Sequence, residues 1–364
     1  MATALLTTYL SDYRLPLFEL LAAREDVEVL CRGGGERYAP PWFADLDGQL
    51  ARAPFPARRL GPPARAFTAA RDYEAVIAPF AGGSLLPLAY LGARRYGRPF
   101  VLWASVWSQP RSLAHAVVLP LTRQIYRDAD AVVAYGEHVR RFVARWRGRD
   151  DDVFVAPQAV EPAFTAPAGA FEQAQFRARH GLGDGPLVLY VGRLVVEKGI
   201  DVLAQAWQRA RPHATLVVIG DGPLASSLDG VAGTRLLGPL PREELPVAYA
   251  SAELALLPSV PTPRFREPWG LVCNEAMHQG CPVLASSAVG AVAGGLVRHD
   301  DTGWVVAPGD ADALGGAIAL LLGDGALRAR LGAAGRAAVA SHTPEAMADA
   351  FGRALAVARA RRRR

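Results

Sequence analysis

The sequence predicts an α/β fold made of two doubly wound domains, each with a parallel sheet covered by helices. Short apolar runs alternate with helical patterns along nearly the whole chain, which is typical of βαβ units. The alternation stops once, over residues 157–169, where three prolines indicate a linker, and then it starts again. A length of 364 residues exceeds one ordinary hydrophobic core and suits two domains.

Five apolar runs in the first half predict the strands of one sheet. These strands are expected at residues 3–10, 27–30, 75–78, 100–104 and 131–135. The helices between them are expected at residues 15–23, from the Gly82-Gly83 pair to Arg95, and at residues 111–128. Residues 51–71 are rich in proline and arginine, which predicts a long loop.

The second half repeats the same alternation and predicts a second sheet. Its strands are expected at residues 187–191, 215–219, 235–237, 254–257 and 282–285. Its helices are expected at residues 200–211, 242–250, 271–279, 311–322 and 326–340, with a last helix from about Pro344. We therefore expect domains at residues 1–165 and 166–345, and a C-terminal helix at 346–364 that packs back toward the first domain. Two such domains facing each other would place a ligand cleft between the carboxyl ends of their sheets.

The composition narrows the class of protein. A net charge of +5 favours anionic substrates or lipid headgroups, but no basic stripe interleaved with aromatic residues predicts nucleic-acid binding. Three cysteines, Cys31, Cys273 and Cys281, form neither a disulfide framework nor a zinc-binding spacing, which predicts a reducing compartment. With no signal-peptide pattern and no apolar run of ~18 residues, we expect a cytoplasmic protein.

The first chemical motif surrounds Lys198, the only lysine among 40 basic residues. An apolar run is followed by Gly192, Arg193, Glu197, Lys198 and Gly199, and then by a helical pattern. The glycines let the backbone approach a ligand, while the exposed amides of a helix start favour an anion beside the two cations. The pattern predicts a diphosphate site; the alternative is an ordinary turn whose charges face solvent.

The second motif holds two carboxylates, Glu267 and Glu275, separated by seven residues. Pro268 disfavours helix at Glu267, so this residue is expected in a loop, and residues 270–272 are expected to form the first turn of the following helix. Carboxylates accept hydrogen bonds from hydroxyls, and free amides donate to phosphate. This combination suits a sugar nucleotide; the alternative is a solvated pair of surface glutamates.

With these motifs, the second half resembles the retaining, nucleotide-sugar-dependent glycosyltransferases of the GT-B fold, family 4, from about residue 187 to residue 309. The resemblance also rests on Ile-Gly-Asp-Gly-Pro at 219–223, Leu-Pro-Ser at 257–259 and Thr-Gly-Trp-Val at 302–305. It implies two Rossmann-like domains with an interdomain cleft, and a nucleoside diphosphate sugar as donor.

The resemblance implies a role for each residue of the donor site. Arg193 and Lys198 would bind the donor diphosphate and Glu267 would contact the transferred sugar, which makes these three the catalytic candidates. Glu275 would hold the ribose. The donor-binding candidates are the glycine of the turn, the first residues of the helix, the ribose-binding carboxylate and two residues near the nucleobase: Gly192, Gly270, Leu271, Val272, Glu275, Leu240 and Glu243.

The first half matches the family less well. Residues 12–18 resemble the opening of some members, but the histidine expected after residues 101–105 is absent, and Val-Trp-Ser stands there at 106–108. The acceptor-side candidates are Arg14, Trp107 and His115. As alternatives, Arg14 would cap a surface, Trp107 would belong to the core, and His115 would be structural.

The expected reaction is hexose transfer with retained anomeric configuration to an acceptor hydroxyl of a small natural product, a saccharide or a lipid-linked molecule. Because two cations can replace a metal, we expect neither a metal nor a cofactor, and a UDP-sugar is favoured over a GDP-sugar as donor. The alternatives are a sugar-nucleotide 2-epimerase of the same fold and a catalytically silent nucleotide- or carbohydrate-binding protein.

The expected partners are the nucleoside diphosphate sugar and an acceptor that the sequence does not name, with no nucleic acid; the oligomeric state is not indicated. Residues 111–127 and the arginine tail at 361–364 predict peripheral contact with an anionic membrane surface. The alternative for the tail is a solvated terminus.

Overall fold

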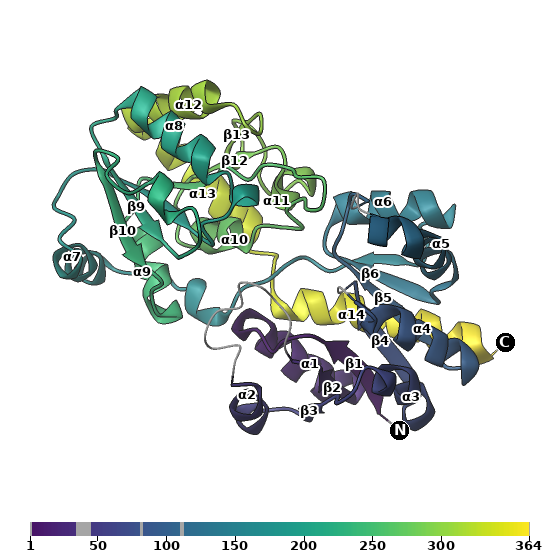
Figure 1. The fold of residues 1–364 in the computed structure, drawn as a ribbon. Coiled ribbons are helices and arrows are strands. Elements are labelled where there is room, and N and C mark those ends of the chain that lie inside the picture. The colour runs from purple at the N-terminus through teal and green to yellow at the C-terminus, as the bar shows by residue number, and fades with distance from the viewer. Residues whose placement is uncertain (1, 34–44, 81–82, 110–112, 364) are drawn as a thin grey trace. The chain divides into compact units, whose positions relative to one another are not determined.

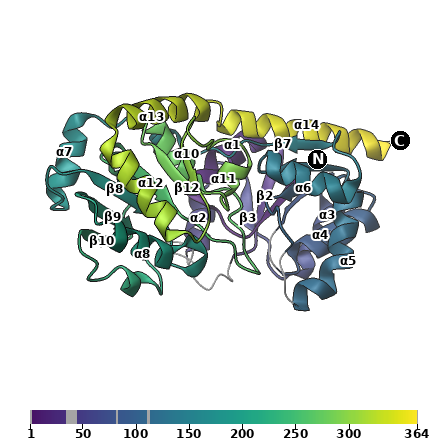
Figure 2. The ribbon, with the colours of Figure 1, turned by 90° about the horizontal axis from the view of Figure 1, so that it is seen from above.

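The chain forms two parallel β-sheets, one in each of two structural units (Figures 1 and 2). A computed structural model describes residues 2–33, 45–80, 83–109 and 113–363. The first unit comprises Met1–Glu161 and Thr343–Arg364, and the second comprises Pro162–His342. The chain passes from the first unit to the second inside the proline-rich segment at 157–169.

The sheet of the first unit has seven parallel strands in the order β3-β2-β1-β4-β5-β6-β7. The strands are β1 (Thr3–Thr7), β2 (Val27–Cys31), β3 (Ala57–Arg59), β4 (Ala75–Pro79), β5 (Phe100–Ala104), β6 (Ala131–Ala134) and β7 (Val153–Val155). All five residues of β1 and of β5 are buried, because helices cover both faces of the sheet. The strand order reverses between β1 and β4.

Seven helices belong to the described part of this unit. They are α1 (Leu15–Glu25), α2 (Leu46–Arg52), α3 (Ala64–Asp72), α4 (Leu85–Arg95), α5 (Leu113–Asp128), α6 (Glu137–Arg147) and α14 (Pro344–Arg363). One core cluster lies under α3, α4, α5 and α6. The opposite cluster lies under α1 and α14, with Phe18 and Phe351 fully buried in it. The last helix of the chain therefore completes the core of the first unit.

The expectation of a long loop over residues 51–71 is wrong. This segment holds the end of α2, the edge strand β3 and most of α3. In α3 three alanines face the core, Ala66, Ala69 and Ala70, while the arginines lie outside. Pro63 immediately precedes the helix, where its missing N–H costs no helical hydrogen bond. Gly82 and Arg111, from which two helices were expected to start, lie outside the described residues.

The sheet of the second unit has six parallel strands in the order β10-β9-β8-β11-β12-β13. The strands are β8 (Leu187–Val191), β9 (Thr215–Ile219), β10 (Thr234–Gly238), β11 (Leu254–Leu257), β12 (Val283–Ser286) and β13 (Trp304–Val306). The helices are α7 (Ala170–Arg179), α8 (Ile200–Ala210), α9 (Leu245–Ala250), α10 (Leu271–His278), α11 (Gly290–Ala293), α12 (Ala311–Gly323) and α13 (Gly325–Val339). The order of these strands reverses between β8 and β11.

The arginine tail is bound to its own unit. Arg361 forms an ion pair with Asp152, and Arg362 Nε lies 3.1 Å from Asp130 Oδ1. This part of the tail is therefore not a free, solvated terminus. No helix in the described ranges is long and apolar enough to cross a membrane.

Candidate active site

The candidate site of the second unit lies where its strand order reverses. Neighbouring strands β8 and β11 pair in parallel, with Leu256 opposite Tyr190. The chain that leaves β8 therefore runs beside the chain that leaves β11, at the carboxyl edge of the sheet. Open α/β sheets bind their ligands at this point.

The turn after β8 is fixed by close backbone packing against the turn after β9. Gly192 N–H donates to the carbonyl of Ile219 at 2.9 Å. Gly220 has φ +137°, and a Cβ on it would lie 2.0 Å from the carbonyl oxygen of Gly192. The Leu194 amide donates to the carbonyl of Asp221 at 2.9 Å. The two glycine motifs found in the sequence thus hold each other in place.

Lys198 ends a short 3-10 helix, Val196–Lys198, which is tied to the loop after β11. Gly199 has φ +73°, and a Cβ on it would lie 2.0 Å from the carbonyl oxygen of Pro258. Val260 N–H donates to the carbonyl of Glu197 at 3.0 Å. Only glycine allows such an approach, so the shape of this turn, which brings Lys198 to the neighbouring loop, depends on residue 199.

Lys198 Nζ forms an ion pair with Glu267 Oε2. The two side chains are 15% and 8% exposed, so the pair is largely desolvated. Ser259 Oγ donates to the same carboxylate oxygen at 3.2 Å. A cation suited to phosphate and a carboxylate suited to sugar hydroxyls therefore lie in direct contact, from loops that are 69 residues apart.

The loop that carries Glu267 is held between α10 and α11. The Ala291 amide donates to the carbonyl of Trp269 at 2.7 Å, and Trp269 Nε1 donates to Asn274 Oδ1 at 2.7 Å. Gly270 has φ +92°, and a Cβ on it would lie 2.6 Å from Leu257 Cδ2. The helix begins at Leu271, as the sequence predicted, so its first amides have no acceptor within the helix.

Glu275 is buried, and both of its oxygens accept hydrogen bonds. Arg242 Nη2 donates to Oε1 at 2.8 Å, and the Tyr249 hydroxyl donates to Oε2 at 2.7 Å. Burial, and then the Glu275 charge, raise the pKa of Tyr249 well above its ordinary value. The Arg242 guanidinium also lies over the ring of Phe164, 4.8 Å from its centroid. Glu275 could still accept further hydrogen bonds, because a carboxylate has about four acceptor positions.

Sequence reasoning missed Arg242 and Tyr249. They precede Glu275 by 33 and 26 residues, and no spacing in the sequence links such distant positions. The nucleobase candidates lie beside them: Leu240 is half-buried, and Glu243 is exposed. Glu243 lines a hollow of about 370 Å³ shared with α7 and α9.

Cys273, in the first turn of α10, lies among the charged groups of the site. Burial raises the pKa of its thiol; Glu267 and Glu275 raise it further, and Lys198 lowers it. The thiol is therefore held protonated and is unsuited to act as a nucleophile. Glu267, Glu275 and Lys198 thus all lie near enough to Cys273 to act on its thiol.

Arg193 lies in the turn between Gly192 and Leu194. Its carbonyl accepts a hydrogen bond from the Tyr190 hydroxyl at 2.8 Å. Its guanidinium is 39% exposed and lies 3.7 Å from Glu197 Oε1. The backbone of Arg193 is fixed while its exposed side chain can turn toward a ligand.

Of the acceptor-side candidates in the first unit, Arg14 is buried, so its role as a surface cap is wrong. Its Nη2 donates to the Tyr135 hydroxyl and to Gln158 Oε1, each at 2.8 Å. The guanidinium also lies 4.6 Å from the centroid of the Trp103 ring and 5.0 Å from that of Tyr13. The structure thus places Arg14 in an aromatic cage at the carboxyl edge of the first sheet.

The other two acceptor-side candidates are placed differently. Trp107 is half-buried and makes an edge contact with His138, with 5.2 Å between ring centroids. His115 belongs to α5, but its side chain lies outside the described part of the chain. Trp103 is a core residue, packed 5.1 Å from Phe351 between ring centroids.

Comparison with known proteins decides the family. The profile of the family "Glycosyl transferases group 1" matches residues 172–338. A GDP-mannose-dependent alpha-(1-6)-phosphatidylinositol monomannoside mannosyltransferase of Mycolicibacterium smegmatis is 32% identical over 272 residues, 70% of this chain and 69% of that protein. The chain belongs to the group 1 glycosyltransferases. The corresponding enzyme of Mycobacterium tuberculosis H37Rv is 31% identical over 330 residues, 82% of this chain and 83% of that protein.

Solved structures confirm the GT-B fold of this group 1 glycosyltransferase. Anabaena HepE in complex with UDP and glucose has a TM-score of 0.79 at 19% identity and covers 98% of this chain and 99% of its own. Sucrose-phosphate synthase from Thermosynechococcus elongatus has a TM-score of 0.73 at 24% identity, with 97% of each chain covered. The two-domain α/β fold predicted from the sequence is therefore correct.

Proposed function

We propose that this glycosyltransferase moves a hexose from a nucleoside diphosphate sugar to an acceptor hydroxyl and retains the anomeric configuration. The contact between Lys198 and Glu267 is the observation that carries the proposal. It joins a phosphate-binding cation to a hydroxyl-binding carboxylate at the reversal of the strand order, beside the amino end of α10. A donor diphosphate and its sugar need these two groups side by side.

In the proposed reaction the bond between the anomeric carbon and the diphosphate oxygen breaks. Negative charge grows on that oxygen, and Lys198 and Arg193 stabilise it chiefly in the transition state. The acceptor hydroxyl attacks from the face that the diphosphate leaves, and its proton passes to the departing phosphate. The new bond therefore forms with retention, and no enzyme base is required after β5.

The other proposed donor contacts lie in the loop before α10 and in the first two turns of that helix. Glu267 receives sugar hydroxyls while the free amides at Gly270, Leu271 and Val272 donate to sugar and phosphate oxygens. Glu275, oriented by Arg242 and Tyr249, receives the ribose hydroxyls. Two cations balance the diphosphate charge, so the proposal needs neither a metal nor a cofactor, and turnover should persist in excess EDTA.

One experiment tests both the nucleobase of the donor and the identity of the acceptor. The mycobacterial relatives are named as GDP-mannose-dependent and act on a phosphatidylinositol mannoside, whereas HepE was solved with UDP and glucose. The preference for a UDP-sugar stays a proposal. Incubation with UDP-glucose, UDP-N-acetylglucosamine or GDP-mannose, each with inositol 3-phosphate or a phosphatidylinositol mannoside as acceptor, should release nucleoside diphosphate in one acceptor-dependent pair.

The anomeric configuration of the product, read by NMR, completes this test. Retention supports the mechanism, and inversion contradicts it. The donor alone separates the alternatives: a 2-epimerase would change the sugar without any acceptor. A silent binding protein would bind the nucleotide tightly, with neither transfer nor donor hydrolysis.

A further inference from the structure

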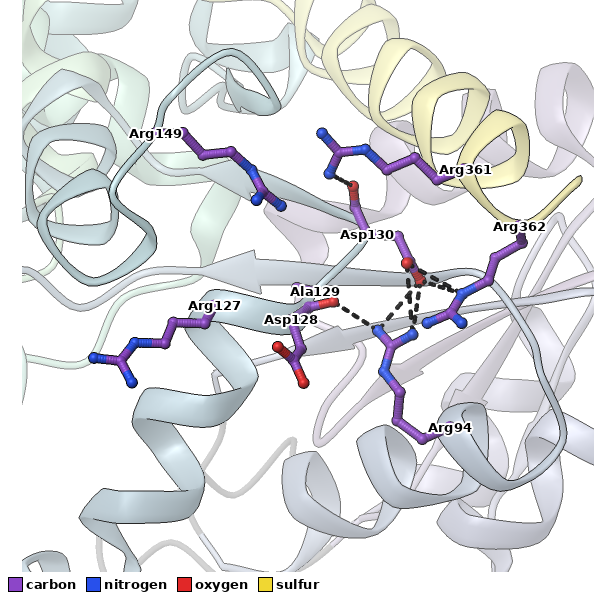
Figure 3. Close-up of a pocket in the computed structure, with 8 residues that line it drawn as sticks. All are labelled: Arg94, Arg127, Asp128, Ala129, Asp130, Arg149, Arg361 and Arg362. Atoms are coloured by element: carbon purple, nitrogen blue, oxygen red, sulfur yellow. Dashed lines mark hydrogen bonds and ion pairs between the residues drawn. The ribbon is translucent and has the colours of Figure 1, made fainter. Parts of the chain in front are cut away.

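An arginine-rich pocket lies in the first unit, at the edge of the sheet opposite to the carboxyl ends of its strands (Figure 3). Its volume is about 480 Å³. The arginines that line it are Arg94, Arg127, Arg149, Arg361 and Arg362. They come from the ends of α4, α5 and α14 and from the segment after α6, around the residues that precede β6. The pocket is therefore separate from the carboxyl edge of this sheet, where Arg14 and Trp107 lie.

Two buried aspartates hold four of these arginines in position. Asp130 Oδ2 lies 3.2 Å from both Nη1 and Nη2 of Arg94, and Asp130 also pairs with Arg362. Asp152 pairs with Arg361 and, at 3.0 Å, with Arg149 Nε. Figure 3 shows Arg94, Arg149, Arg361 and Arg362 directed toward Asp130, whereas Arg127 extends away from it. The cations are thus ordered before any ligand arrives, which reduces the entropic cost of binding.

Several of these guanidinium groups keep donors for a ligand. Arg149 and Arg362 use only Nε in their bonds to the aspartates, at 3.0 Å and 3.1 Å. Arg127 uses Nε in a long bond of 3.4 Å to the carbonyl of Trp146. Within the described ranges, Nη1 and Nη2 of all three make no hydrogen bond. A fork of two terminal N–H groups matches two oxygens of one phosphate.

The pocket keeps a net positive charge after its aspartates are counted. With Arg147, which pairs with Asp152, six arginines stand here against four aspartates, Asp128, Asp130, Asp151 and Asp152, an excess of two positive charges. Capping of helix ends explains part of the cluster, since Arg94 donates to the carbonyl of Asp128 at 2.9 Å and Arg361 to that of Asp130 at 2.7 Å. Among the described residues, Arg149 and Arg362 donate to no carbonyl, so capping does not account for them.

We propose that this pocket binds a ligand that carries two or more phosphate groups. The lining contains no aromatic side chain on which a base could stack, so the phosphates themselves are what the pocket recognises. A soluble oligophosphate and the headgroup of a phosphorylated lipid share this chemistry. Binding takes place away from the strand ends that carry the acceptor-side candidates of this unit.

The variant Arg149→Ala with Arg362→Ala removes two of the free forks and leaves the Asp130–Arg94 and Asp152–Arg361 pairs in place. Its matched control is Arg145→Ala with Arg363→Ala, which removes two exposed arginines near the same helix ends, outside the pocket lining. Both variants lose two positive charges, so a general electrostatic effect would be equal in the two. Thermal unfolding checks that both are folded, and Arg127→Glu serves as a second pocket variant that breaks no ion pair.

Calorimetric titration with tripolyphosphate at low salt tests the soluble source, and flotation with vesicles tests the lipid source. The vesicles are phosphatidylcholine with or without phosphatidylinositol 4-phosphate. We expect one of these probes to bind the wild type, with affinity at least about tenfold weaker in the pocket variants and nearly unchanged in the control. Absence of binding in both arms, or equal loss in pocket and control variants, would overturn the proposal.

Discussion

The Lys198 ammonium and the Glu267 carboxylate form a largely buried ion pair between the turn after β8 and the loop before α10. Ser259 Oγ supports the same carboxylate oxygen at 3.2 Å. In the absence of a ligand each charged group thus satisfies the other, which keeps an isolated charge from being buried. A donor diphosphate would compete with Glu267 for Lys198, so the pair would link donor binding to the position of the carboxylate that we propose binds the sugar.

Glu267→Gln should separate the role of Glu267 as the ion-pair partner of Lys198 from its proposed role in binding the sugar. It removes the partner of a buried ammonium, so the free energy of unfolding of the unliganded protein should fall by about 3 kcal/mol. Nucleoside diphosphate should still bind at least as tightly as to the wild type, because Lys198 is released, whereas turnover should fall on the order of a hundredfold. Urea unfolding, titration with UDP and GDP, and initial rates measure the three effects. Glu345→Gln, at an exposed position of α14, is the control, and normal turnover in Glu267→Gln would refute the assigned role.

Tyr249→Phe should weaken donor binding through Glu275. The hydroxyl donates to Glu275 Oε2 at 2.7 Å, and its loss frees one side of the carboxylate that we propose binds the ribose. A hydrogen bond of about 1 kcal/mol corresponds to a roughly fivefold rise in KM for the donor, with kcat nearly unchanged because the contact is the same in the transition state. Tyr126→Phe is the matched control, since the buried Tyr126 hydroxyl has no hydrogen-bond partner among the described residues. An equal rise in KM for both variants would speak against the role of Tyr249.

The second unit should lose stability in mild acid through His342. Burial and the nearby His278 lower the pKa of His342 to about 4, below its ordinary value near 6.5. A histidine with a lowered pKa binds protons more readily in the unfolded chain, so stability falls as the pH drops from 6.5 toward 4. Between pH 7 and pH 5 this contributes a loss of about 2 kcal/mol.

Urea unfolding of the wild type and of His342→Phe at the two pH values measures this effect. The phenylalanine preserves the aromatic contact with Trp269, whose ring centroid lies 5.9 Å from that of His342. The variant should lose about 2 kcal/mol less than the wild type on going from pH 7 to pH 5. His213→Phe, at an exposed position, should behave as the wild type; an unchanged pH response in His342→Phe would contradict the prediction.

The sequence predicted the strands and the separate motifs better than it predicted their contacts. Apolar runs marked the central strands, because parallel strands covered on both faces contain little else. The proline- and arginine-rich segment concealed β3 and α3, since an exposed edge strand and a helix with an alanine face carry a weak apolar signal. Tertiary packing alone brings Arg242 and Tyr249 to Glu275, and the same holds for the cage of Arg14.

The two loops that meet at Lys198 and Glu267 also show that motifs were easier to predict than the contacts between them. Each motif was recognisable by itself, and glycine positions with positive φ, such as Gly199 and Gly270, matched the turns that the motifs require. The ion pair, however, joins residues 69 positions apart and depends on the order β8-β11 in the sheet. A single sequence carries no direct record of that strand order.

Turnover of Lys198→Arg with the nucleotide sugar tests the central claim most directly. Arginine keeps the charge but replaces a compact ammonium by a planar fork, which cannot occupy the same place between Glu267 and the donor diphosphate. Arg193→Lys is measured beside it, because it makes the reverse exchange at the more exposed of the two proposed diphosphate-binding cations. We predict that kcat of Lys198→Arg falls about a hundredfold. Near-normal turnover would contradict the claim that this lysine stabilises the leaving diphosphate.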